Sequence, residues 1–387
     1  MEIRQLEGGD YKRYREITYR GYPALRDFSS KGIKDYEENL ITMLNHQDEV
    51  RFFGAFIEEE LVAVMRLFTI KMNIFGKLQT VSGLGFLATD PLFKNQGIGR
   101  KMVEFFEKDA LDHGIFLGIL LPFRPDFYGK VGYGILSKLH RYEIGIEYLP
   151  NKPKEVLLKE VKDFHEIFSF QKRMATNHHG HTILLESEKE EIKEDLETYT
   201  IGAYNKECIG YLRYRTRPLF LGNYTRNYFQ IEDLVTESPK GLEALLSHLK
   251  DQKDQGEYIL WDTHREGVEH FFEHPLDRSG NYIPRGYLQS NISAVGLMGK
   301  ILNYDDFLEA YPSFSSLKTF TWKMDYKTFG HGEEIMIKEK HLAPLWLGTI
   351  SPRALYELGL ISCKENVLET LENILPRVRP LLTNLDL

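Results

Sequence analysis

A glycine-containing turn within residues 87–100, LATDPLFKNQGIGR, constrains the fold of this chain more than any other stretch. An apolar run ends at Pro91, and apolar residues at helical spacing begin directly after Gly97. Glycines let the backbone approach a ligand closely, and the free amides and dipole at the start of a helix favour an anion. A Gly-x-Gly pair is also common in ordinary turns, so its position between a strand and a helix is the stronger signal. The sequence predicts a phosphate-binding turn here.

The segments around this turn predict an α+β unit about 145 residues long. Helical patterns come first, antiparallel strands follow, and the glycine turn then leads into a helix and further strands. We expect helices near residues 11–22, 33–44 and 97–111, and strands within 51–76, 78–90, 114–123 and 128–144.

The pattern of this unit recurs once along the chain. The segments GAFIEEELVAVMRLF from Gly54 and GAYNKECIGYLRYR from Gly202 share a Gly-Ala-aromatic start, a polar turn and a strand with an arginine. The second copy continues with TESPKGLEALL, which contains no Gly-x-Gly, so its phosphate turn is missing. Amphipathic helices and short strands then predict a third, mixed α/β unit. The predicted domains are residues 1–147, 148–285 and 286–387.

Composition excludes several classes of protein. The start of the chain has no apolar signal segment, and no run approaches the ~18 apolar residues that a membrane helix needs. Two cysteines make no disulfide framework, and HHGH at 178–181 lacks zinc-ligand spacing, so no metal is expected. A formal net charge of −8 argues against nucleic acid as a partner. We expect a cytoplasmic protein without membrane partners.

The glycine turn resembles motif A of the GCN5-related N-acetyltransferases, with lysine where arginine or glutamine is usual. A Rossmann dinucleotide-binding fold is excluded by the order of the predicted elements. A Walker phosphate loop is excluded because no Gly-Lys-Ser/Thr follows the glycines. The resemblance implies acetyl-CoA, with its pyrophosphate on the turn and its pantetheine arm paired like a strand with the preceding backbone. The implied contacts are Phe86, Leu87, Ala88 and Thr89 for the pantetheine arm, and Lys94, Asn95, Gln96, Gly97, Ile98, Gly99 and Arg100 for the turn.

Further motifs are similar to those of the Eis-type acetyltransferases (enhanced intracellular survival). These are the glycine turn itself, YGKVGYG at residues 128–134 and LWLG at residues 345–348. The resemblance implies tandem acetyltransferase domains, the second degenerate, followed by a domain like a sterol carrier protein. It also implies acetylation of primary amines of cationic substrates, of the aminoglycoside, polyamine or lysine type, by a homo-oligomer such as a hexamer.

The resemblance assigns two catalytic groups. Tyr128 falls on the family's catalytic tyrosine and would act as the acid for the departing thiolate, whereas Tyr133 is assigned to packing. The carboxylate of Leu387, where family members commonly end in phenylalanine, would receive the ammonium or its proton. Neighbouring Asp386 competes for this role, and a frayed terminus is the alternative.

The residues that contact the acceptor substrate are expected within residues 19–34, where Tyr22, Asp27 and Phe28 could bind a polyamine. No motif fixes these three residues, and a solvated loop is the alternative for each. Two other functions stay open at this stage. One is a lipid-binding or scaffold protein with a relic acetyltransferase domain, and the other is an acyltransferase that uses a longer acyl-CoA or a hydroxyl acceptor.

Overall fold

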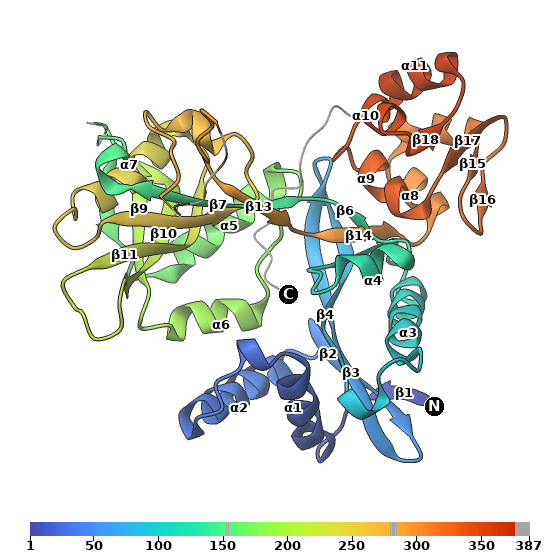
Figure 1. Ribbon diagram of the computed structural model, residues 1–387, viewed down its shortest axis with the longest axis horizontal. Coiled ribbons are helices and arrows are strands. Elements are labelled where there is room, and N and C mark those ends of the chain that lie inside the picture. The colour runs from blue at the N-terminus through green and yellow to red at the C-terminus, as the bar shows by residue number, and fades with distance from the viewer. Residues whose placement is uncertain (152, 154, 279, 281–282, 284, 376–387) are drawn as a thin grey trace.

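The computed structural model describes residues 1–387 except 152, 154, 279, 281–282, 284 and 376–387. Two seven-stranded sheets and one four-stranded sheet organise the chain. Figure 1 shows the first sheet in the centre, the second at the left and the small third sheet at the upper right. The α+β tandem layout with a third C-terminal unit, expected from the repeat in the sequence, is confirmed.

The first sheet has the strand order β1-β2-β3-β4-β5-β14-β6. Neighbouring strands are antiparallel except β4 and β5, which run parallel. The strands are β1 (Glu2–Gln5), β2 (Val50–Ile57), β3 (Glu60–Ile74), β4 (Lys77–Thr89), β5 (Leu117–Leu120), β6 (Gly134–Ile135) and β14 (Met298–Ile301).

Helices cover both faces of this sheet. On β3 the side chains alternate, so that Met65 and Leu67 belong to the core beneath one face while Val64 and Ile70 belong to the core beneath the other. The first core also holds the apolar side of α3, and the second holds that of α1. The helices are α1 (Asp10–Gly21), η1 (Pro23–Leu25), α2 (Ser30–Asn45), η2 (Pro91–Phe93), α3 (Ile98–Asp112) and α4 (Pro125–Lys130).

The second sheet repeats this design with the order β13-β7-β12-β11-β10-β9-β8. Its one parallel pair, β11 with β12, corresponds to β4 with β5. The elements are β7 (Lys138–Gly145), η3 (Ile146–Tyr148), β8 (Leu157–Glu160), α5 (Phe164–Asn177), α6 (Glu186–Glu194), β9 (Tyr199–Asn205), β10 (Glu207–Pro218), β11 (Asn227–Thr236), α7 (Pro239–Lys250), β12 (Tyr258–Thr263), η4 (Val268–Phe271) and β13 (Ile292–Val295).

Two strands lie in a different sheet from the one that their place in the chain suggests. We expected the strand within 128–144 to complete the first unit, but β7 pairs with β12 and β13 of the second sheet. In exchange β14, which follows the second sheet in the chain, pairs with both β5 and β6 of the first sheet, and Figure 1 shows it beside β6. The domain boundaries at residues 147 and 285 stay a prediction, and the two sheets are interlocked across them.

The third part surrounds a small sheet with the order β16-β15-β17-β18. Trp322 and Trp346 meet edge to face in its core, with ring centroids 5.5 Å apart. None of the described helices has both the length and the apolar composition needed to cross a membrane. The elements are α8 (Tyr304–Ala310), η5 (Pro312–Thr319), β15 (Phe320–Lys323), β16 (Thr328–Phe329), β17 (Glu333–Ile337), η6 (Glu339–His341), α9 (Leu342–Trp346), α10 (Pro352–Glu357), β18 (Ile361–Ser362) and α11 (Glu365–Ile374).

Candidate active site

The glycine turn leaves the N-terminus of α3 open. Asn95 and Gly97 have φ angles of 63° and 76°, so the backbone turns through the left-handed region just before the helix. No side chain caps α3, and the amides of residues 96–100 have no acceptor in the described part of the chain. A Cβ added at Gly97 would meet no atom within 4 Å, so the turn is open at this residue. The turn can therefore hold an anion such as a pyrophosphate.

The strand before this turn has a free edge. Parallel pairing of β4 with β5 ends at Leu84 and Leu120, although β4 continues to Thr89. Opposite β3, the register shifts at Phe86 and Leu87, and Phe86 has a φ of 46°. The bulge and the divergence of β4 from β5 leave the backbone of residues 85–89 without a strand partner on the β5 side among the residues that the structure describes. The residues predicted to bind the pantetheine arm lie on this segment.

Two predicted tyrosines lie near each other, and one of them contacts the free edge. The hydroxyl of Tyr22 donates to the carbonyl of Leu87 at 2.8 Å. Tyr128, on α4, is 8% exposed, and burial together with the nearby Tyr22 phenol raises its pKa well above the ordinary value. Burial also raises the pKa of Tyr22 to about 12. Both phenols are therefore protonated at neutral pH, which is the state that a proton donor needs.

A buried carboxylate ties α1 to the start of the glycine turn. Asp90 is fully buried, and it accepts hydrogen bonds from Arg13 at 2.9 Å and Arg20 at 3.0 Å. Its other oxygen accepts from the amide of Leu92 at 3.0 Å and so caps η2. The sequence analysis did not single out Asp90, because its two arginines lie about 70 residues earlier in the chain. The aspartate fixes the direction in which the turn leaves β4.

A cavity of about 1140 Å³ lies between the first and second sheets. Phe86 and Leu121 line it, so the cavity reaches the bulge of β4 and the end of β5. Eight carboxylates and five arginines line its wall, which gives it a net negative character. The carboxylates are Asp35, Glu188, Glu191, Glu194, Asp195, Glu232, Asp233 and Asp262, and the arginines are Arg26, Arg66, Arg213, Arg215 and Arg265.

None of the three predicted acceptor residues, Tyr22, Asp27 and Phe28, lines this cavity. Asp27 accepts from the amide of Ser29 at 2.7 Å next to the start of α2, and Phe28 is 61% exposed and packs edge to face on Tyr19. Neither lines the cavity, whereas Arg26 and Tyr36, which were not predicted, do. The helical spacing of Tyr36 with Leu40 and Met43 on α2 is the signal that could have identified this face.

The remaining sequence predictions fall outside this centre. Leu387 and Asp386 lie outside the described residues. Of the HHGH histidines, His179 stacks on Phe75 with centroids 4.5 Å apart, whereas His178 and His181 lie together, with centroids 5.6 Å apart, and line the cavity. Among the described residues no cluster of three or more histidine, cysteine or carboxylate side chains is arranged to hold a metal ion.

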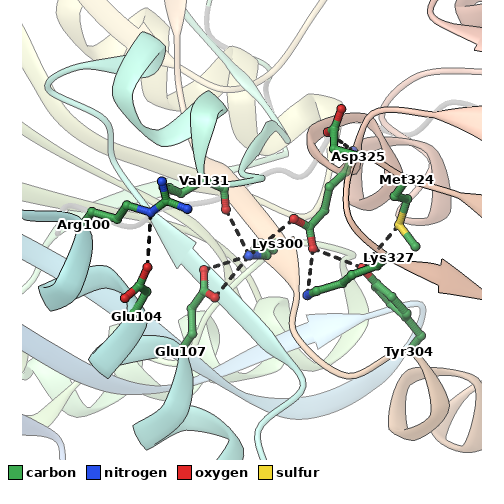
Figure 2. Close-up of polar contacts among 10 residues, drawn as sticks. Arg100, Glu104, Glu107, Val131, Lys300, Tyr304, Met324, Asp325 and Lys327 are labelled. Carbon is green, nitrogen blue, oxygen red and sulfur yellow. Dashed lines mark hydrogen bonds and ion pairs between the residues drawn. The ribbon is translucent and has the colours of Figure 1, made fainter. Parts of the chain in front are cut away.

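A buried lysine joins the third part of the chain to the glycine-turn helix. Lys300 of β14 is 6% exposed and donates to Glu107 of α3 at 3.0 Å and to the carbonyl of Val131 at 3.0 Å (Figure 2). Glu339 lies 3.7 Å from the same ammonium, and it also accepts from Lys327 and Tyr304 of the third part. The third part of the chain is thus anchored to α3, on the side away from the cavity.

Comparisons with known proteins agree with this geometry. A family model described as an acetyltransferase (GNAT) domain matches residues 2–136, and one described as a sterol carrier protein domain matches residues 321–383. These matches and the fold define the class of the chain. It is an enzyme with an N-acetyltransferase domain of the GNAT type at one end and a sterol carrier protein domain at the other.

Solved structures share the fold over almost the entire chain. A probable N-acyltransferase from Enterococcus faecalis V583 is 16% identical with a TM-score of 0.79, covering 99% of this chain and 98% of that one. A GCN5-related N-acetyltransferase from Anabaena variabilis ATCC 29413 is 15% identical, with a TM-score of 0.78 and coverage of 99% and 98%. Eis1 from Mycobacterium abscessus is 15% identical, with a TM-score of 0.70 and coverage of 98% and 98%. No curated protein matches the chain in sequence.

Proposed function

We propose that the chain is an acetyl-CoA-dependent N-acetyltransferase of the Eis type that acetylates primary amines of cationic small molecules or peptides. The observation that carries the proposal is the open N-terminus of α3 beside the unpaired edge of β4. A diphosphate fits the free amides of the turn, and an amide-containing arm fits a strand edge that has lost its neighbour. Lys94 and Arg100 are exposed next to the turn and add positive charge.

The chemistry requires movement of two protons. A lysine-like amine has a pKa near ~10 and arrives protonated, and acetyl-CoA supplies the acetyl group as a thioester. Tyr128 would donate a proton to the departing sulfur, because its phenol is protonated at neutral pH. The carboxylate of Leu387 remains the proposed group that receives the ammonium. Cytoplasmic location and a homo-oligomer remain predictions from the sequence.

The acceptor class follows from the charge of the cavity. Its eight carboxylates against five arginines favour a cation over an anion of the same size. Several of these carboxylates already have partners within the chain, since Asp195 and Glu232 are paired with Arg215 and Asp262 is paired with Arg141, so the preference for a cation rests on the net charge of the wall. Aminoglycosides, polyamines and lysine side chains all meet this requirement. A lipid-binding or scaffold role is not favoured, because a relic domain would not need to keep the turn in front of α3 open.

Calorimetry with acetyl-CoA tests the proposal at Gly97. Gly97→Asp places a negative charge at the amides, and it also strains a left-handed residue by roughly 1 kcal/mol, so affinity should fall at least about 100-fold. The matched control is Gly97→Asn, which has the same shape without the charge and tolerates this conformation, so roughly tenfold loss is expected. Equal affinity of the two variants, or no binding by the parent chain, would contradict the proposal.

A further inference from the structure

Two arginines converge on one phenylalanine at the inner end of the cavity. The guanidinium carbon of Arg66 lies 4.2 Å from the ring centroid of Phe86, and that of Arg26 lies 4.8 Å from it. Arg66 comes from β3 and is 5% exposed, whereas Arg26 follows η1 and is half-buried. Both arginines line the cavity, and Phe86 forms the bulge of β4. Two positive charges therefore lie beside the free edge of β4.

Neither charge is neutralised by the described residues of the chain. Arg66 donates to the hydroxyl of Tyr14 at 2.6 Å and to the sulfur of Met43 at 3.3 Å, and neither partner is a carboxylate. The Nε and Nη2 atoms of Arg26 are buried, and no acceptor for them occurs in the part of the chain described. Burial, with Arg66 nearby, lowers the pKa of Arg26. Unpaired buried guanidinium nitrogens are costly, so the site is built for a partner that the described chain does not supply.

The second sheet contains an arginine at the matching position that does have a carboxylate partner. Arg213 occupies on β10 the place that Arg66 occupies on β3, in the arginine-bearing strand of the repeat, and it lines the same cavity. There the chain provides the counter-ion, because Asp195 lies 3.2 Å from Arg213 and 2.9 Å from Arg215. The matched position in the first sheet lacks this carboxylate. The two sheets thus differ in whether a carboxylate of the chain pairs with the arginine, although the Nε atom of Arg213 also lacks a hydrogen-bond partner among the described residues.

We infer that Arg26 and Arg66 form a binding site for a carboxylate, within the acceptor pocket of the proposed acetyltransferase. A planar guanidinium matches a carboxylate in shape and charge, and the Nε and Nη2 atoms of Arg26, which lack acceptors in the described chain, offer it two donors beside the charge of Arg66. The acceptor is then an amine that also carries a carboxylate, as a free amino acid does. Its carboxylate lies at Phe86, and its ammonium faces the acidic wall. The other possible source of this carboxylate is the chain's own terminus at Leu387, which lies outside the described residues.

Binding of matched ligands without acetyl-CoA tests the site. We would titrate the full-length protein with lysine and phenylalanine and with their amides, which keep the amine and lose the carboxylate. The acid-rich cavity by itself favours the more positive amides, so tighter binding of the free acids by about 10- to 100-fold would require a specific cation partner. In Arg26→Gln this ratio should fall to near one. Arg265→Gln, which removes the same charge from the same cavity, should keep the ratio.

Two further experiments identify which carboxylate fills the site and establish whether the variants are folded. If the C-terminal carboxylate fills the site, the parent chain should bind free acids no more tightly than their amides. A chain whose Leu387 carboxylate is converted to an amide should then prefer the free acids. Thermal unfolding and acetyl-CoA affinity establish that Arg26→Gln is folded, and Arg26→Lys should retain part of the preference because it keeps the charge.

The site and the proposed function can fail separately. No preference for free acids in either the parent or the amidated chain would overturn the carboxylate site, as would an equal loss in Arg26→Gln and Arg265→Gln. Acetylation of amines would in that case still support the transferase. Conversely, an Arg26-dependent preference in a protein that acetylates no amine would retain the site and remove the proposed activity.

Discussion

The first and second sheets have the same strand plan, but the helices that follow their parallel strands begin differently. Before α3 the chain turns through Gly97 with no side-chain cap. Before α7 the hydroxyl of Ser238 accepts from the amide of Gly241 at 3.1 Å, and Pro239 has no amide to offer. A Cβ at Gly241 would lie 2.4 Å from the hydroxyl of Thr236, so this helix start is already filled.

This difference shows how a fold loses a ligand site without losing its architecture. A helix N-terminus needs partners for its first amides, and they come from a bound anion or from a capping side chain. The second sheet keeps the bulge, at Arg213 and Tyr214 of β10, and the parallel pair of strands. The loop between strand and helix has changed. The second unit is therefore a structural copy whose site has been closed by its own side chains.

The largest effect should come from the tyrosine that the first unit has and the second lacks. The α4 helix after β5 contains Tyr128, whereas η4 after β12 reads VEHF. Tyr128→Phe removes the proposed acid and should lower kcat about 100-fold while acetyl-CoA affinity stays the same. Tyr133→Phe, which changes a fully buried neighbour, is the control and should retain most of the turnover. Comparable kcat values for the two variants, measured by thiol release, would remove Tyr128 from the mechanism.

A second effect concerns the acidic residue that follows each strand. Asp90 is fully buried under Arg13 and Arg20, but Glu237, in the same position after β11, makes a solvent-exposed pair with Arg173 at 3.2 Å. Asp90→Asn should lower the free energy of unfolding by about 2 kcal/mol, because two arginines lose a buried partner. Glu237→Gln should cost less than about 1 kcal/mol, since exposed ion pairs contribute little. Urea unfolding measures both, and similar values would show that the two loops are anchored alike.

The smallest effect tests the closed helix start itself. Ser238→Ala removes the cap of α7 and should lower the free energy of unfolding by about 1 kcal/mol. Acetyl-CoA affinity should not change, because the missing glycine turn is not restored by removing one hydroxyl. Thermal unfolding and calorimetry give the two quantities. A second binding site appearing in this variant would mean that the cap alone keeps the second unit from binding the coenzyme.

The sequence predicted what is encoded locally. The glycine turn, the helix after it and the repeat could be read from spacing, and the structure has each of them. The exchange of β7 and β14 between the two sheets could not be predicted. The residue pattern of a strand indicates which of its faces is buried, but it does not indicate which sheet the strand joins. Asp90 and the Arg26–Phe86–Arg66 cluster were missed for a related reason. Their partners are 20 to 77 residues apart, and only the folded chain brings them together.

The insertion of β14 also sets the order in which this chain can fold during synthesis. Residues 298–301 complete the hydrogen-bonding edge of β5 and bridge it to β6, so the first sheet stays unfinished until the ribosome has made most of the chain. Until then a nascent edge is exposed and prone to pairing with other chains. A fragment ending near residue 147 would carry the complete glycine turn on an incomplete sheet, and expression trials should therefore keep the polypeptide at full length.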